Sequence, residues 1–280
     1  MASTPRWLVM TYPTLNAYVE SCKAAGYAET TIRDRRELLM RVASDLGALH
    51  EITTARLTTW LANDGWCAQT RATYYGHLHG YYLWALKTER IPADPMLHMV
   101  RPRVPKRSPR PARNLHYERI MAEAAPEWRI AATLARYAGL RAAEVSRATR
   151  EDVDDQDLRV LGKGGRTDTL PTHPSVWKLV QDLPPGRLLL TPRGRPYTPA
   201  GISHSFGYRM RELGIPITLH MLRHLFATSL LRAKEDGGAG ANLRVVQELC
   251  RHASVATTAG YTQVTDRERR LAIRTLPAAA

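Results

Sequence analysis

The fold and chemistry of this chain are decided by one stretch, which begins Thr218-Leu219-His220-Met221-Leu222-Arg223-His224 and ends Arg251-His252-Ala253-Ser254-Val255-Ala256-Thr257-Thr258-Ala259-Gly260-Tyr261. His220 and Arg223 are three residues apart, so they share one face if the segment is helical. Arginine binds a planar anion with two hydrogen bonds, histidine moves protons near neutral pH, and tyrosine can act as a nucleophile. No serine, cysteine or carboxylate is placed as a nucleophile. The stretch therefore indicates a phosphate site more than a hydrolase.

Two motifs in this stretch have a specific order and spacing. His-x-x-Arg-His is followed by Leu-x-x-His-x-Ser-x-x-Thr-Thr-x-x-Tyr-Thr. This pattern resembles the tyrosine recombinases, a family of phage integrases and Xer-type recombinases, and Arg251 stands where that family usually has glycine. The resemblance implies a mainly α-helical protein with a small β-sheet, in which an α-helical core-binding domain precedes an α+β catalytic domain.

The resemblance also implies six catalytic residues, which are Arg141, Lys163, His220, Arg223, His252 and the nucleophile Tyr261. In the family, the tyrosine attacks the scissile phosphate and forms a 3′-phosphotyrosyl bond, while the two arginines bind the non-bridging oxygens. The lysine gives a proton to the departing 5′-oxygen, the first histidine assists proton transfer, and the second hydrogen-bonds the phosphate. The resemblance implies no cofactor. ATP is not needed because the phosphotyrosyl bond conserves the energy of the phosphodiester, and metal is not needed because two guanidiniums neutralise the phosphate.

Some of these positions have simpler interpretations. Arg141 would form an ordinary surface pair with Glu144 at i+3, although its order relative to the later motif favours the site. Lys163 lies in a glycine-rich turn, where a lysine also serves solubility, and the surrounding residues lack the pattern of an ATP-binding loop. His220 and His224 are four residues apart, but neither a His-Glu-x-x-His pattern nor a third ligand accompanies them. Packing or substrate contact is therefore favoured over zinc binding.

The composition limits the partners of the chain. Its 280 residues include 40 Lys and Arg against 26 Asp and Glu, and the resulting charge of +14 favours a polyanion such as duplex DNA. A basic protein with another role would show the same balance. Cys22, Cys67 and Cys250 match neither a disulfide framework nor a zinc site, which suits a reduced bacterial cytoplasm. The apolar run 7–10 is too short for a signal peptide, and no run approaches a membrane span.

Residues 1–100 are expected to form a helical, SAM-like core-binding domain. After a loose arm at residues 1–12, apolar residues recur at helical spacing within 14–26, 30–46, 57–61 and 70–87. Thr30 or Thr31 is expected to cap the second helix, and Gly47 to follow its end. Arg33 and Arg36 lie on the outer face of that helix and are candidates for DNA contact. The alternative is an ordinary solvated face.

A basic, proline-rich linker is expected at residues 101–113. Six prolines between residues 91 and 113 preclude a long regular helix. The candidate DNA-binding residues here are Arg101, Arg103, Lys106 and Arg107. Cations of this kind bind phosphates and release counterions. A solvated tether between domains is the alternative, and the two are compatible.

Residues 114–280 are expected to form the catalytic domain with a C-terminal tail. The pattern predicts helices at 115–125, 128–138, 203–213, around His220, and from Val245 to His252. A β-hairpin is predicted at 157–172, and a mobile loop, longer than the family usually has, at 233–242. By resemblance, a short helix carries Tyr261 and the last helix, within 266–276, docks on a neighbouring protomer.

Exchange between two duplexes uses four active sites. The resemblance therefore implies a homotetramer at duplex DNA core or attachment sites, formed from subunits that are monomers in free solution. Strand exchange is expected to pass through a Holliday junction. An accessory directionality factor is a possible further partner, and no membrane is expected. The chain begins close to the core-binding domain, so we expect a simple recombinase without an arm-type-binding domain.

Several functions share these features. Arg251 and the alanine-rich end favour integration and excision of a phage or mobile element. Xer-type resolution of circular DNA dimers is the alternative within the family, and a type IB topoisomerase suits the length less well. A non-catalytic, sequence-specific DNA-binding protein is the alternative from another class. A nuclease dependent on metal or ATP lacks its carboxylate cluster and phosphate loop.

Overall fold

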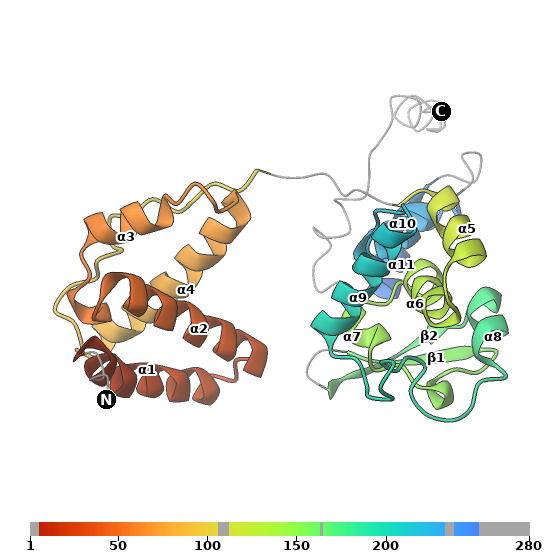
Figure 1. The fold of residues 1–280 in the computed structure, drawn as a ribbon, viewed down its shortest axis with the longest axis horizontal. Helices are drawn as coiled ribbons and strands as arrows, with labels where there is room; N and C mark the ends of the chain where they lie inside the picture. Colours follow the sequence, from red (N-terminus) through yellow and green to blue (C-terminus); the bar gives the residue numbers. More distant parts are fainter. Residues whose placement is uncertain (1–5, 106–111, 163–164, 233–237, 252–280) are drawn as a thin grey trace, which may run out of the picture. The chain divides into compact units, whose positions relative to one another are not determined.

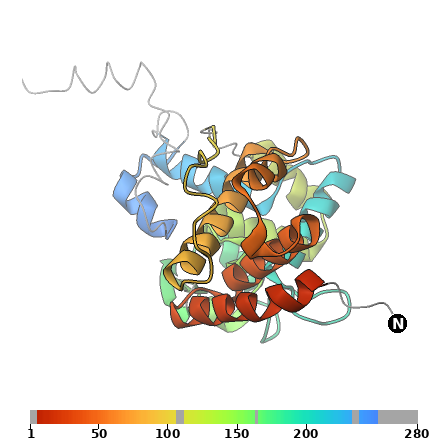
Figure 2. The same ribbon diagram turned by 90° about the vertical axis from the view of Figure 1, so that its left-hand side faces the viewer.

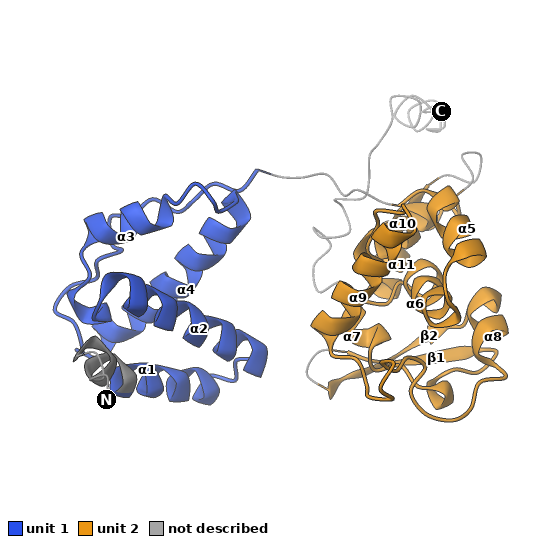
Figure 3. Cartoon of the chain, viewed as in Figure 1, with its two compact units in different colours: residues 1–107 blue, residues 108–280 orange. Residues whose placement is uncertain are grey.

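The computed structural model describes residues 6–105, 112–162, 165–232 and 238–251. The chain divides into two compact units, unit 1 at residues 1–107 and unit 2 at residues 108–280 (Figure 3). The described elements are helices apart from one pair of strands (Figure 1). This confirms the prediction of a mainly α-helical fold with a small β-sheet.

Unit 1 is a bundle of helices, namely α1 (Arg6–Ala24), α2 (Glu29–Leu46), α3 (Thr54–Leu61) and α4 (Ala68–Lys87). Helix α1 packs against α2, and α4 packs against each of the other three (Figures 1 and 2). The core contains fully buried side chains from every helix, among them Leu15, Leu39, Leu57, Leu78 and Tyr82. These helices therefore share one hydrophobic core.

Two predictions about unit 1 were wrong in detail. The loose arm is not found at residues 6–12, because α1 begins at Arg6 and continues through Pro13, although a proline removes one backbone hydrogen bond. Helix α2 begins at Glu29, and the residue before it, Ala28, has extended φ and ψ angles and no capping side chain. The predicted caps Thr30 and Thr31 are therefore already inside the helix. Gly47 follows the end of α2 as predicted.

Unit 2 carries most of the helices and the only described sheet. Its helices are α5 (Asn114–Glu123), α6 (Pro126–Tyr137), α7 (Ala142–Val145), α8 (Pro174–Val180), α9 (Pro199–Glu212), α10 (Leu219–Leu231) and α11 (Leu243–Leu249). Strand β1 (Asp157–Leu161) pairs antiparallel with β2 (Thr167–Pro171), so the predicted hairpin is confirmed. Leu158 lies opposite Leu170, and both are buried.

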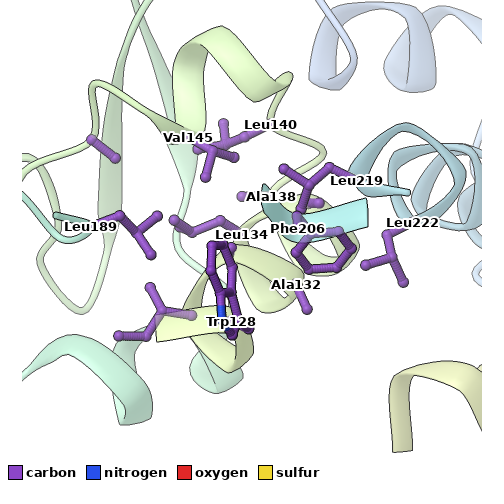
Figure 4. Close-up of a cluster of buried hydrophobic side chains, with 14 of the residues drawn as sticks. Trp128, Ala132, Leu134, Ala138, Leu140, Val145, Leu189, Phe206, Leu219 and Leu222 are labelled. Atoms are coloured by element: carbon purple, nitrogen blue, oxygen red, sulfur yellow. The ribbon is translucent and has the colours of Figure 1, made fainter. Parts of the chain in front are cut away.

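The core of unit 2 is built around α6. This helix packs against α5, α8 and α10, and its residues from Ala131 to Ala135 are all buried. In Figure 4 the ring of Trp128 lies near that of Phe206 from α9, and their centroids are 6.2 Å apart. Leu219 and Leu222 of α10 belong to the same cluster. The packing of α6 against α10 fixes the two chain segments that carry the predicted arginines.

Helices α9 and α11 of unit 2 have boundaries that differ from the prediction. Helix α9 begins at Pro199, earlier than predicted, because the Thr198 hydroxyl accepts a hydrogen bond from the Gly201 amide at 3.0 Å. Helix α11 begins after Asn242, whose side chain accepts from the Arg244 amide at 2.8 Å. It ends at Leu249 and does not reach His252, which lies outside the described residues. Residues 233–237 of the predicted loop are also outside them.

Candidate active site

Helix α10 holds His220 and Arg223 in its first turns. The hydroxyl of Thr218 accepts a hydrogen bond from the Met221 amide at 3.3 Å and caps the helix. Buried leucines on the same helix anchor it to the core, while His220 itself is exposed. The ring of His224 lies against that of His220, with centroids 4.1 Å apart. The rings therefore pack together, as the alternative to zinc binding predicted.

Arg141 precedes α7 and is tied to Glu144 by two hydrogen bonds. Its backbone amide donates to Glu144 Oε2 at 2.7 Å, and its Nη1 donates to Glu144 Oε1 at 2.9 Å. The predicted i, i+3 pair is therefore present. However, Arg141 Nη2 also donates to the carbonyl oxygen of Arg251 at 2.8 Å. Arg141 is thus a half-exposed side chain at a junction of distant segments, and not a simple surface arginine.

Arg223 is almost completely buried, with 2% of its side chain exposed. Its guanidinium donates to the carbonyl oxygens of Gly139 and Cys250, and its Nη1 lies 3.9 Å from Glu144 Oε2. Burial and the neighbouring charge of Arg141 lower the pKa of Arg223 to about 10. The guanidinium therefore keeps its charge at neutral pH.

Glu144 is the anion around which the arginines gather. Its side chain is 5% exposed, and it lies in α7 between the segments that carry Arg141 and Arg223. Burial raises the pKa of Glu144, but the charge of Arg251 and the hydrogen bonds from Arg141 and Arg251 outweigh it, so the net direction is downward. The arginines compensate the negative charge of this buried carboxylate, and the carboxylate in turn fixes the positions of the arginines.

Arg251 is a site residue whose contacts the sequence did not predict. Its Nη2 donates to Glu144 Oε2 at 2.7 Å and to the Gly139 carbonyl at 3.3 Å. Its side chain is 8% exposed, and its φ angle is +52°. The sequence signalled only that an arginine stands where the resembled family has glycine.

The exposed His220 lies close enough to Arg223 and Arg141 for their charges to act on its imidazole. Desolvation, followed by the charges of Arg223 and Arg141, lowers the pKa of His220 from its ordinary value of 6.5. The imidazole is therefore neutral at pH 7. A neutral imidazole can accept a proton, which is the role expected of a general base.

Half of the predicted catalytic set cannot be compared with the structure. Lys163, His252 and Tyr261 lie outside the described residues. The strands on either side of the turn that contains Lys163 are described, and the Gly162 amide donates to the Arg166 carbonyl at 2.8 Å. The structure thus brings together Arg141, Arg223 and the neighbouring His220.

The predicted DNA-binding residues of unit 1 are exposed where the structure describes them. Arg33 and Arg36 lie on α2, with Arg33 paired to Asp34 and Glu37, and Arg101 and Arg103 lie before the linker. Lys106 and Arg107 are outside the described residues.

A cavity of about 650 Å³ in unit 1 is lined by Arg35, Gln69, Ala72, Thr73, Gly76, His77, Arg101, Pro102 and Val104. The prediction had not singled out Arg35.

The described residues contain no group of three or more His, Cys, Asp or Glu side chains arranged to hold a metal ion. No helix among them has the length and apolar character to cross a bilayer. The charged groups that the structure describes at this site are guanidiniums and a carboxylate, with the imidazole of His220 beside them. Two arginines with fixed positions can bind two oxygens of one phosphate group, and an imidazole beside them can move a proton.

Known proteins resemble this chain in sequence and in fold. A model of the phage integrase family matches residues 113–268. The tyrosine recombinase XerC of Brucella melitensis is 33% identical over 273 residues, which cover 86% of this chain and 84% of that protein. A lambda integrase (75–356) dimer bound to a COC′ core site is similar in fold, with a TM-score of 0.73, 20% identity and coverage of 92% and 96% of the two chains. A lambda integrase tetramer bound to a Holliday junction gives a TM-score of 0.69 at 18% identity, with 87% and 77% covered.

Proposed function

The chain belongs to the phage integrase family of tyrosine recombinases, enzymes that cleave and rejoin DNA, and we propose that it exchanges strands between specific duplex sites through a 3′-phosphotyrosyl intermediate. The observation that carries this proposal is the convergence of Arg141 and Arg223 on one buried carboxylate, with the neutral His220 beside them. Such a cluster is suited to a single phosphodiester.

In the proposed reaction, Tyr261 attacks the scissile phosphorus. A bond forms between the tyrosine oxygen and phosphorus while the bond from phosphorus to the 5′-oxygen breaks. His220 accepts the phenolic proton, and Lys163 gives a proton to the departing 5′-oxygen. Arg141 and Arg223 bind the non-bridging oxygens, on which negative charge grows in the transition state.

His252 completes the proposed set by donating a hydrogen bond to the same phosphate. Religation runs the reaction in reverse, with a 5′-hydroxyl attacking the phosphotyrosine. The energy of the original phosphodiester is retained in the phosphotyrosyl bond, so the exchange consumes no nucleotide.

We infer that duplex DNA is the substrate and that unit 1 adds binding energy. The net charge of +14 and the exposed arginines of α2 and of residues 101–103 support this role. Two duplexes contain four strands to be cut, so exchange needs four tyrosines and a tetramer. The likeness in fold to the lambda integrase tetramer on a Holliday junction is consistent with this number.

The biological role has two candidates. Integration and excision of a phage or mobile element is our proposal, and Arg251, which stands where the resembled family usually has glycine, supports it. The curated XerC relative supports resolution of circular dimers as the second candidate. An attachment sequence beside the gene, duplicated at both ends of an element, would decide for integration. A site without such duplication would decide for the second role.

The chemical proposal is tested by trapping the adduct. A binding site is first selected from random DNA with the Tyr261→Phe protein and is then built into a nicked duplex from which the cut strand is lost. The wild type should form a covalent protein–DNA adduct that migrates as a shifted band on a denaturing gel. Tyr261→Phe should bind the same duplex and form no adduct, whereas Tyr208→Phe, which alters an exposed tyrosine of the same unit, should react normally. An adduct in Tyr261→Phe would refute the assigned nucleophile.

A further inference from the structure

Arg251 occupies a backbone conformation that is costly for an arginine. Its φ angle is +52°, in the left-handed region that favours glycine. Among the non-glycine residues that the structure describes, Glu89 is the only other one with a positive φ. A glycine would fit this position without strain, and the contacts of the arginine side chain are one way to offset the cost.

The guanidinium of Arg251 is directed into the site. Its Nη2 donates to Glu144 Oε2 at 2.7 Å and to the Gly139 carbonyl at 3.3 Å, and its Nη1 donates to the Leu249 carbonyl at 3.0 Å. Only 8% of the side chain is exposed, against 5% for Glu144. An ion pair buried to this extent fixes both partners, because separating them would leave an uncompensated charge.

Arg251 also holds Arg141 by a second route. The carbonyl oxygen of Arg251 accepts a hydrogen bond from Arg141 Nη2 at 2.8 Å. Glu144, which Arg251 pairs with, accepts from Arg141 Nη1 at 2.9 Å. Arg251 therefore acts on both terminal nitrogens of Arg141, on Nη2 through its own carbonyl oxygen and on Nη1 through the carboxylate that it orients.

The pair between Arg251 and Glu144 has a consequence for Arg223. Glu144 Oε2 is 2.7 Å from Arg251 but 3.9 Å from Arg223, which is instead held by two backbone carbonyls. Carbonyl oxygens orient a guanidinium without cancelling its charge. Without Arg251, Glu144 Oε2 would keep only the hydrogen bond from the Arg141 amide, and it could pair more closely with Arg223.

We infer that Arg251 is a positioning residue of the strand-cleavage site, which holds Glu144 and Arg141 in place and leaves the charge of Arg223 available to the phosphate. This inference rests on the proposed function. Arg251 therefore adds to the site a side chain that a glycine at position 251 would lack.

The test uses Arg251→Gly, because glycine accepts the backbone conformation and removes only the side chain. In single-turnover reactions with the nicked duplex at saturating protein, the rate of adduct formation should fall about 10–100-fold, since a misplaced guanidinium loses transition-state contacts. The dissociation constant for DNA should change less than about threefold, because the Arg251 side chain is 8% exposed and donates to Leu249, Gly139 and Glu144. Arg251→Lys, which keeps the charge, should recover part of the rate.

Two further variants separate positioning from general damage. Arg244→Ala removes an exposed arginine of α11 that pairs with Glu248 at 2.8 Å, and it should cleave at the wild-type rate. Glu144→Gln should slow cleavage, and adding Arg251→Gly to it should cause little further loss, because both changes act through one pair. Melting temperatures of all variants identify any that fail to fold, and Arg251→Lys then replaces Arg251→Gly.

The outcomes are distinguishable. A wild-type protein that forms no adduct would overturn the proposed function, and this inference with it. A wild-type adduct together with an unchanged rate in Arg251→Gly would overturn the inference alone. The inference would also be overturned if the rate losses of Glu144→Gln and Arg251→Gly multiplied in the double variant, or if Arg251→Gly lowered only the affinity for DNA. Neither result is expected if both residues act through the Glu144 carboxylate.

Discussion

Replacing Gly139 with alanine tests how the site depends on the packing of α6 against α10. Gly139 has a φ of +59°, and a Cβ atom added to it would lie 2.5 Å from Phe226 Cδ1. Carbon atoms prefer a separation of about 3.5–4.0 Å, so the ring or the backbone must move. The carbonyl of Gly139 accepts hydrogen bonds from Arg223 and Arg251, so a backbone shift here moves the arginines.

The free-energy cost of Gly139→Ala has two parts, and the control variant Gly214→Ala separates them. Alanine at a positive φ costs about 1 kcal/mol, and overpacking of a core adds about 1–3 kcal/mol. Gly214 has a φ of +66°, and a Cβ atom added to it would have no neighbour within 4 Å, so Gly214→Ala carries the first cost alone. Each kcal/mol lowers the melting temperature by about 2–4 °C in a unit of this size. Gly139→Ala should therefore unfold about 2–12 °C below Gly214→Ala.

Calorimetry of the full chain measures this difference, and single-turnover cleavage measures its effect on the site. Gly139→Ala should cleave on the order of 100-fold more slowly, because displacements of about 1 Å cost that much, while Gly214→Ala should keep its rate. Equal melting temperatures for the two variants would refute the packing argument. A destabilised Gly139→Ala that cleaves normally would show that the Gly139 carbonyl does not position Arg223.

Three further outcomes follow from the described contacts. Arg223→Ala should slow cleavage about 10²–10³-fold, because it removes a preorganised charge. The control Arg209→Ala, on the polar face of α9, should cleave at the wild-type rate. Near-normal cleavage by Arg223→Ala would show that Arg223 does not belong to the site. The NMR titration of His220 should give a pKa below 6.5, so that most of the imidazole is neutral at pH 6.5. Arg141→Gln should raise this pKa, because it removes a positive charge that lowers it. An unchanged pKa in Arg141→Gln would contradict the assigned cause. Asn242→Ala should destabilise α11 by about 1 kcal/mol through loss of its cap, seen as faster hydrogen exchange in that helix, and unaltered exchange would mean that the cap contributes nothing.

Much of the local structure was predictable from residues that are close in sequence. The i, i+3 spacing of His220 and Arg223 predicted that one helix presents both, and α10 does so. The alternation of Leu158, Val160 and Leu170 predicted the hairpin that the structure contains. Helix starts were less predictable. Thr198 and Asn242 cap α9 and α11, but Ala28 precedes α2 without any capping side chain.

The sequence by itself determined the order and chemical identity of the site residues, because helical spacing and motif order are properties of neighbouring positions. Only the tertiary structure decided which groups compensate the buried charges. Arg223 donates to a carbonyl 84 residues away, and Arg251 pairs with a carboxylate 107 residues away. Such partners depend on how α6, α7, α10 and α11 pack around the core, and burial then forces each guanidinium to find an acceptor. No local pattern of residues carries that information.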